Sequence, residues 1–146
     1  MAMDAFSASL MADKREIIFA PTGYKLQSFA QRAEEFQLIE RDVVLTNEFI
    51  YTPFMKELGL KCSFVFQEKF GAGEPSEAMI QTMYDAIPYD SYDRVIAVGG
   101  GAIMDLCKLL GCKRPDSVHE LYYKRFPVVH EKDVIAIPTT CGTGSE

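Results

Sequence analysis

The sequence predicts an α/β fold with a mostly parallel sheet flanked by helices. Short apolar runs alternate along the chain with stretches in which apolar residues recur every three to four positions, which is typical of repeated strand–helix units. The run at 94–98 (RVIAV) is apolar at almost every position, as expected of a strand buried on both faces of a sheet. Glycine or proline follows several of these runs and marks where strands end.

The same patterns place each element along the chain. Strands are predicted at 16–20, 42–46, 61–67, 94–98 and 133–137. Helices are predicted at 26–36, 51–58, 77–87 and 102–111. We therefore expect strand and helix to alternate over most of the chain, with a polar, tyrosine-rich segment before the last strand.

Local signals define the ends of two of these helices. In the helix at 51–58, Pro53 is expected in the first turn and Gly59 just past the end. In the helix at 77–87, Ser76 is the expected N-cap and Pro88 ends the helix. The residues of this second helix that we expect to face the sheet are Ala78, Met79, Met83 and Ile87.

Length and charge bound the function. The chain has 146 residues, 48% of them hydrophobic, so we expect one domain at 16–146 behind a loose leader at 1–15. Fifteen Lys and Arg against 21 Asp and Glu give a net charge of −6 without a basic run, which argues against a nucleic-acid partner. The sequence has no apolar stretch near the roughly 20 residues of a membrane span and no signal peptide, so we expect a cytoplasmic protein with no membrane contact.

The cysteines and histidines do not form a metal-ligand pattern. The four cysteines are not closely spaced, and we expect them to be reduced. Cys62 and Cys107 lie among apolar neighbours and are interpreted as small buried hydrophobic residues. The two histidines, His119 and His130, flank the tyrosine-rich segment and are expected at the surface.

A glycine triplet follows the strand at 94–98. Because Gly99, Gly100 and Gly101 have no side chains, a ligand can approach the backbone closely while the helix from Ala102 directs free N–H groups at it. Such a turn suits a pyrophosphate, although the spacing is not GxGxxG. The alternative is a tight strand-to-helix turn with no ligand.

A second loop, PTTCGTGSE at 138–146, follows the last strand. Together with GGGAIMDLCK at 99–108, it resembles the two signatures of the iron-containing (metal-dependent, group III) alcohol dehydrogenase family, in its N-terminal nucleotide-binding domain. The second signature matches throughout. The first has Ala102 in place of the usual Ser and Cys107 in place of the usual Ala.

The resemblance implies a Rossmann-like, dehydroquinate synthase-like fold and a set of cofactor-binding residues. Backbone at the glycine triplet and Ala102 would wrap the pyrophosphate, and Asp105 would lie near the cofactor and the substrate pocket. Asp105 has a competing role as a helix charge paired with Lys108. The second loop would bond the adenosine and nicotinamide parts of the cofactor, or else form a polar turn that satisfies its own backbone. The loop residues expected to contact the cofactor are Thr139, Thr140, Gly142 and Thr143.

The chain departs from the family after the strand at 42–46. The family commonly has a Thr-Asp pair there, whose carboxylate accepts hydrogen bonds from the adenosine ribose, whereas this chain has Thr46 and Asn47. A neutral Asn47 can bond a ribose hydroxyl without excluding a 2′-phosphate, so the cofactor is expected to be NAD or NADP. Asn47 could equally be only a turn residue before the next helix.

The implied function is an NAD(P)-dependent, metal-dependent alcohol dehydrogenase acting on a small alcohol, aldehyde or hydroxy acid. Fe²⁺ or Zn²⁺ would be held by an all-helical C-terminal domain that is absent from this chain, so we assign no catalytic or metal-binding residue and expect the truncated chain alone to be inactive. The sequence leaves open whether the protein forms a homo-oligomer. Two other functions are the related glycerol-phosphate dehydrogenase or dehydroquinate synthase chemistry, and a stand-alone nucleotide-binding module.

Overall fold

The computed structural model describes residues 34, 36–123 and 126–139. The expected leader at 1–15, the strand at 16–20 and nearly all of the helix at 26–36 lie outside the described residues. In the second loop, Thr139 is described, and the segment from Thr140 onward lies outside.

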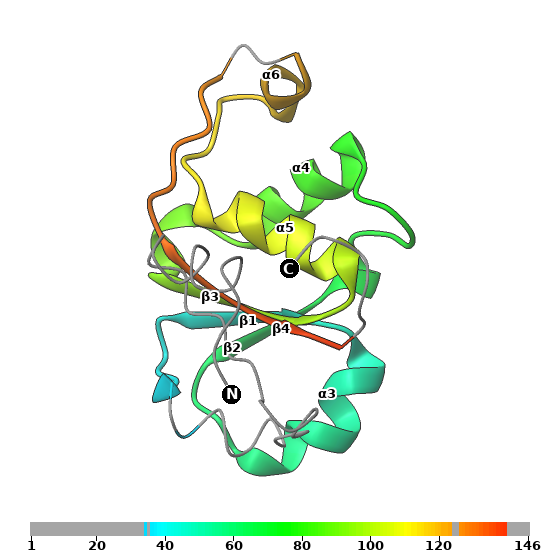
Figure 1. Ribbon diagram of the computed structural model, residues 1–146, viewed down its shortest axis with the longest axis vertical. Helices are drawn as coiled ribbons and strands as arrows, with labels where there is room; N and C mark the ends of the chain where they lie inside the picture. The colour runs from blue at the N-terminus through cyan, green and yellow to red at the C-terminus, as the bar shows by residue number, and fades with distance from the viewer. Residues whose placement is uncertain (1–33, 35, 124–125, 140–146) are drawn as a thin grey trace, which may run out of the picture.

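A four-stranded sheet forms the centre of the described part of the chain (Figure 1). Its strand order is β2-β1-β3-β4, and every neighbouring pair is parallel, which confirms the predicted parallel sheet. The strands are β1 (Asp42–Thr46), β2 (Ser63–Phe66), β3 (Arg94–Gly99) and β4 (Asp133–Pro138). All four were predicted, within two residues at either end.

Helices connect these strands in the expected order. The expected helices are α3 (Glu48–Phe54), α4 (Glu77–Ala86) and α5 (Gly101–Gly111). A further short helix, α6 (Val118–Tyr122), lies in the tyrosine-rich segment and was not predicted. Single 3₁₀ turns follow α3, β2 and α4, at Lys56–Leu58, Gln67–Lys69 and Tyr89–Ser91. None of the helices in the described ranges is both long and apolar enough to cross a membrane.

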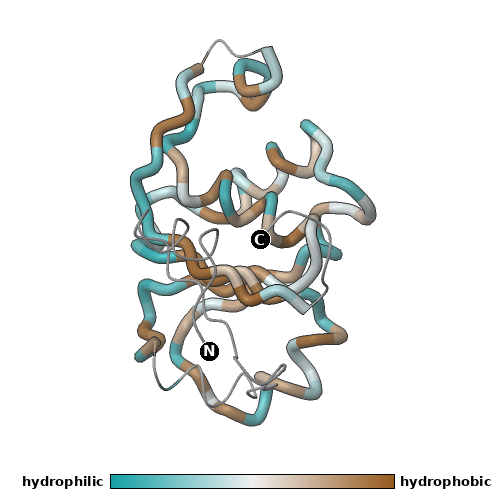
Figure 2. Tube along the Cα trace, viewed as in Figure 1, coloured by the Kyte–Doolittle hydropathy of each residue, from teal (hydrophilic) through white to brown (hydrophobic). Residues whose placement is uncertain are grey.

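The sheet is covered differently on its two faces. Helices α4 and α5 lie on one face and α3 on the other (Figure 1). Side chains of β1 and β3 alternate between two buried apolar clusters, with Val43 and Val95 on the α4 and α5 side and Val44 and Ile96 on the α3 side. Figure 2 shows the strongest hydrophobicity along these central strands. The prediction that 94–98 is buried on both faces is confirmed.

Two details of the helices differ from the predictions. Helix α3 begins at Glu48, before the expected 51, because the Asn47 carbonyl accepts the first helical hydrogen bonds, from the backbone N–H of Ile50 at 3.1 Å and of Tyr51 at 2.9 Å. Pro53 consequently lies inside the helix, beyond its first turn. Gly59 ends the segment as predicted, in the left-handed conformation at φ 59°.

The buried face of α4 also differs in part. Ser76 caps this helix as predicted, since its Oγ accepts from the Met79 N–H at 3.2 Å. Ala78, expected to face the sheet, is exposed, while Ile80 and Tyr84 are buried. The helix is therefore rotated about its axis relative to the expected apolar stripe.

The order of the connections reverses between β1 and β3, at the middle of the sheet, where open α/β sheets generally have a crevice. The chain leaves β1 towards α3 on one face and leaves β3 towards α5 on the other, although the two strands are neighbours. In open α/β sheets, ligands bind outside the carboxyl ends of two strands related in this way. The fold therefore directs attention to the ends of β1 and β3.

Candidate cofactor site

The predicted site residues that the structure describes lie along one edge of the sheet. Asn47 directly follows β1, Gly100 follows β3 and Thr139 follows β4. Because the strands are parallel, their carboxyl ends lie along the same edge. The structure thus brings together those described residues that the two sequence signatures and the end of β1 had singled out.

The first turn of α5 is open to a ligand. Gly100 is the N-cap, in an extended conformation, and neither a side-chain cap nor an acidic residue occupies the turn. The first intrahelical bond runs from the Met104 N–H to the Gly100 carbonyl at 3.1 Å. The N–H groups of Gly101, Ala102 and Ile103 therefore have no acceptor within the helix. This donor set, at the positive end of an 11-residue helix, fits a phosphate or diphosphate.

Gly99 has a packing role at this turn. A Cβ added to Gly99 would lie 2.7 Å from Cγ1 of Ile103, whose side chain is buried, so the absence of a side chain lets α5 start close against β3. The Gly99 carbonyl accepts from the Thr139 N–H at 2.9 Å and joins the ends of β3 and β4. Gly99 accordingly shapes the turn whether or not a ligand is bound.

Asp105 lies on the exposed side of α5, one turn after the glycines. Its carboxylate is 3.5 Å from the Lys108 ammonium, and both side chains are about half exposed, at 49% and 50%. The ion pair considered as an alternative in the sequence is therefore formed. A role for Asp105 towards the cofactor or the substrate stays a prediction.

At the end of β1, Thr46 and Asn47 have different partners. The buried Thr46 hydroxyl donates to the Val98 carbonyl at 2.7 Å and holds the ends of β1 and β3 together. Asn47 is half-buried and occupies the N-cap position of α3, but its side chain makes no cap. Its amide instead donates from Nδ2 to Oε1 of Gln67 at 3.3 Å.

Two residues at the end of β2 were not recognised from the sequence. Gln67, only 8% exposed, donates from Nε2 to the Gly73 carbonyl at 3.4 Å, which orients its Oε1 towards Asn47. Glu68 accepts at Oε1 from the Glu48 N–H at 3.1 Å. The sequence signal was two consecutive polar residues at the end of a predicted strand, which we had interpreted only as the end of that strand.

Burial disfavours the thiolate form of the cysteines near the sheet. Burial raises the pKa of Cys62 to about 11 and raises the pKa of Cys107 further. Cys62, Cys107 and Cys112 are buried and free, as expected for the first two. His119 and His130 are exposed, as predicted, and the described ranges contain no cluster of His, Cys, Asp and Glu that could hold a metal ion.

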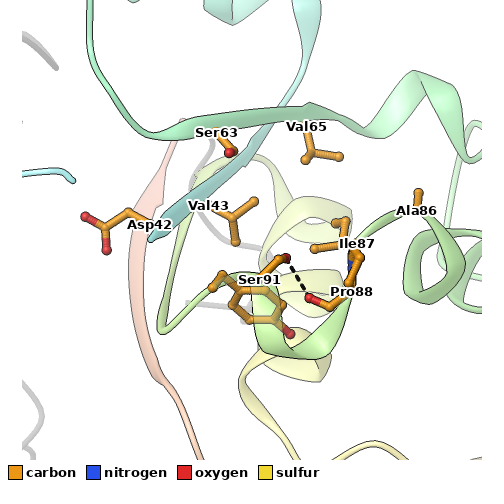
Figure 3. A pocket seen from close by; sticks show the side chains of 9 residues that line it. Asp42, Val43, Ser63, Val65, Ala86, Ile87, Pro88 and Ser91 are labelled. Atoms are coloured by element: carbon orange, nitrogen blue, oxygen red, sulfur yellow. Dashed lines mark hydrogen bonds between the residues drawn. The ribbon is translucent and has the colours of Figure 1, made fainter. Parts of the chain in front are cut away.

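A cavity of about 230 Å³ lies at the opposite edge of the sheet (Figure 3). It is lined near the amino ends of β1 and β2 by Asp42 and Ser63, and after α4 by Ile87 and Ser91. Figure 3 shows Ser91 directed at the Pro88 carbonyl, to which its hydroxyl donates at 2.6 Å. This cavity is therefore separate from the strand ends where the signature residues lie.

The cations near that opposite edge are engaged in the fold itself. The Arg114 guanidinium donates to the Tyr84 carbonyl at 2.9 Å and lies 4.5 Å from the centroid of the Tyr84 ring. The Lys132 ammonium donates to the Tyr92 carbonyl at 2.6 Å and lies 3.9 Å from the Tyr92 ring centroid. These contacts explain both cations as structural residues.

Comparison with known proteins identifies the family. The model of the iron-containing alcohol dehydrogenase family matches residues 15–146. This chain belongs to that family. The resemblance predicted from the two signatures is thereby confirmed, and so is the Rossmann-like α/β fold.

Two proteins of similar sequence are oxidoreductases by their names. The chain is 42% identical over 127 residues to a 4-hydroxybutyrate dehydrogenase of Clostridium kluyveri, which covers 87% of this chain and 34% of that protein. It is 38% identical over 81 residues to the mitochondrial hydroxyacid-oxoacid transhydrogenase of Rattus norvegicus, covering 50% of this chain and 17% of that protein. The chain thus spans about a third or less of these relatives.

Solved structures share the architecture. An iron-containing alcohol dehydrogenase is 27% identical with a TM-score of 0.60, over 82% of this chain and 36% of that one. The sulfoacetaldehyde reductase of Bifidobacterium kashiwanohense, solved in complex with NAD+, is 23% identical with a TM-score of 0.61, over 82% of this chain and 33% of that one. Both likenesses confirm the iron-containing alcohol dehydrogenase fold.

Proposed function

We propose that this chain forms the nicotinamide-dinucleotide site of an iron-containing alcohol dehydrogenase, at the carboxyl edge of its sheet. One observation carries the proposal: the first turn of α5 has a glycine N-cap, no side-chain cap and no acidic residue, and it follows β3, beside β1, where the connections of the sheet reverse. A helix start with these properties stabilises a diphosphate through backbone N–H groups and the helix dipole.

We propose that further residues bind the rest of the dinucleotide. Backbone at Gly100, Gly101 and Ala102 would hold the diphosphate, and Asn47 would meet the adenosine ribose across the crevice. Thr139 extends the site along the end of β4. We propose the same role for the other loop residues of the signature, Thr140, Gly142 and Thr143.

The bound cofactor would supply hydride transfer: the carbon bearing the alcohol gives a hydride to the nicotinamide and its hydroxyl loses a proton, and the reverse reaction reduces the carbonyl. We propose a hydroxy acid as the substrate class, because both named relatives act on hydroxy acids by their names. A metal ion, Fe²⁺ or Zn²⁺, would bind through residues beyond this chain's described part, and we assign it no ligand here.

The test replaces Gly101, the first residue of α5, by Asp. A carboxylate at this position favours the helix, so we expect the fold to be retained, but it places negative charge where the diphosphate would lie. Gly101→Asn is the matched control, because it has nearly the same size without the charge. We expect calorimetric titration to show NADH binding by the wild type, weaker binding by Gly101→Asn, and loss of binding in Gly101→Asp.

Two results would contradict the proposal. If circular dichroism shows that all three proteins are folded and NADH binds the Asp variant as tightly as the Asn variant, the diphosphate does not lie on α5. If the folded wild type binds no dinucleotide, the proposed function is wrong.

A further inference from the structure

We infer that Glu68 makes this site select NAD over NADP, an inference that rests on the proposed function. The sequence left the choice of cofactor open, because Asn47 is neutral. The structure adds a carboxylate from the next strand, since Glu68 reaches across from the end of β2 to the residue that follows Asn47.

The position of the adenosine ribose follows from the sheet geometry. Strands β1 and β3 are direct neighbours, and adjacent strands lie about 4.8 Å apart. A diphosphate on the first turn of α5 lies at the end of β3, so the sugar attached to it, one group further along, reaches the end of β1 across the crevice. Asn47 is the first residue after β1.

Glu68 lies beside that position. Its Oε1 accepts a hydrogen bond of 3.1 Å from the backbone N–H of Glu48, the residue next to Asn47. The Glu68 carboxylate is therefore hydrogen-bonded to the residue that directly follows Asn47, the proposed ribose ligand. A 2′-phosphate carries close to two negative charges and would be repelled there, whereas the 2′-hydroxyl of NAD is neutral.

The orientation of Asn47 acts in the same direction. The Gly73 carbonyl accepts from Gln67 Nε2, and Gln67 Oε1 then accepts from Asn47 Nδ2. This chain of bonds directs one N–H of the Asn47 amide towards β2, so we expect its Oδ1 to be the atom that meets the sugar. An oxygen acceptor stabilises a ribose hydroxyl, which can donate, and disfavours a phosphate, which cannot.

No Lys or Arg among the described residues forms an ion pair with the Glu68 carboxylate. Lys69, the next residue after Glu68, has its ammonium 5.8 Å from the centroid of the Phe66 ring. Among the contacts of the described residues, no Lys or Arg side chain bonds Asn47, Gln67 or Glu68. Glu48 adds a second acidic residue at the same place.

The experiment compares NADH and NADPH in calorimetric titrations of the full chain. Glu68→Gln removes the charge and keeps an oxygen that can accept from the Glu48 N–H. Glu57→Gln is the matched control, because Glu57 is also exposed but lies in the 3₁₀ turn beyond the far end of α3. We expect the wild type to prefer NADH, and Glu68→Gln to shift the ratio of the two dissociation constants about fivefold towards NADPH. The control should leave the ratio unchanged.

Three results would decide against part of this argument. A wild type that binds NADPH as tightly as NADH overturns the inference, as does an equal effect of Glu68→Gln and Glu57→Gln on the ratio. In both cases the dinucleotide site itself stands. A folded wild type that binds neither dinucleotide contradicts the proposed function instead, and the inference fails with it.

Discussion

Arg94 binds the carboxylate of Asp42 with two hydrogen bonds, from Nε to Oδ1 at 2.9 Å and from Nη2 to Oδ2 at 2.7 Å. The two residues are the first of β3 and β1 and are paired in the sheet register. Asp42 is only 3% exposed and also accepts from the Ile39 N–H at 2.8 Å. A buried ion pair therefore aligns the amino ends of the two central strands, opposite the candidate cofactor site.

Replacing Asp42 by Ala should destabilise the fold. The change removes the acceptor of the Ile39 N–H and the carboxylate partner of a partly buried guanidinium, which keeps its hydrogen bond to the Phe36 carbonyl. We therefore expect the free energy of unfolding to fall by about 2 to 3 kcal/mol. Urea denaturation followed by circular dichroism measures this change. A variant as stable as the wild type would show that the pair contributes no net stability.

The exposed pair of Arg41 and Asp93 is the control. Its atoms Nε and Oδ2 are 2.6 Å apart, but the side chains are 51% and 65% exposed, so Asp93→Ala should cost much less than Asp42→Ala. The hydrogen bond from Arg41 lowers the pKa of Asp93. The stability that this pair contributes is therefore present above the pKa of the unfolded chain and is lost as the pH falls through the lower folded value.

Gly111→Ala should also destabilise the protein, by about 2 kcal/mol. Gly111 ends α5 where the helix approaches the start of β4, and an added Cβ would overlap Val134 and lie 3.2 Å from the Lys132 carbonyl oxygen. A backbone atom cannot move aside as a side chain can. Gly59→Ala is the comparison, since nothing lies within 4 Å and only the left-handed conformation is strained, at about 1 kcal/mol. Thermal unfolding measures both changes. A larger loss of stability in Gly59→Ala than in Gly111→Ala would contradict the close packing of α5 against β4.

Ala102→Ser should strengthen cofactor binding. The hydroxyl would add one donor at the first turn of α5, and a single hydrogen bond corresponds to about a fivefold gain in NADH affinity. Cys107→Ala, which restores the other departure from the first signature, changes a fully buried residue. It should leave the affinity unchanged and lower stability by about 1 kcal/mol. Calorimetric titration of both variants with NADH tests this prediction. A change in affinity for Cys107→Ala but not for Ala102→Ser would contradict it.

Cys62 should react slowly in the folded chain. Burial raises its pKa from 9.0 to about 11, and only the thiolate is nucleophilic. A thiolate of higher pKa is also more nucleophilic, so the rate of alkylation at pH 8 should be about tenfold below that in the unfolded chain. The rate should rise with pH as the thiolate forms, as long as the fold persists. Iodoacetamide labelling with peptide mapping gives the rate at this residue. Equal rates in the folded and urea-unfolded chains would show that the thiol is accessible.

The strands were predictable because burial on both faces leaves a local mark. The strand β3 is apolar at consecutive positions, and glycines follow it at once, so its position needed no knowledge of its neighbours. The short helix α6 was not predicted, since a five-residue helix contains too few turns to show a period. Only its packing, with Val118 buried at 2% exposure, identifies it as part of the core.

The helix α4 shows a limit of a different kind. Its cap and its end were predicted from Ser76 and Pro88, which act on their own backbone. Its buried face was predicted in part, because the rotation of a helix on a sheet depends on the side chains it meets. Tyr84 is buried in the cluster that α4 shares with α5, a contact with no counterpart in the local pattern.

The sequence by itself determined the family, the parallel α/β fold and the glycine turn before α5, because motifs and periodicity are properties of neighbouring residues. The tertiary structure alone decided what surrounds Asn47. Gln67 and Glu68 lie 20 residues away from Asn47 and Glu48 along the chain and meet them only because β1 and β2 pair in parallel. The charge at the end of β1 is thus set by the neighbouring strand, through contacts that no local pattern in the sequence records.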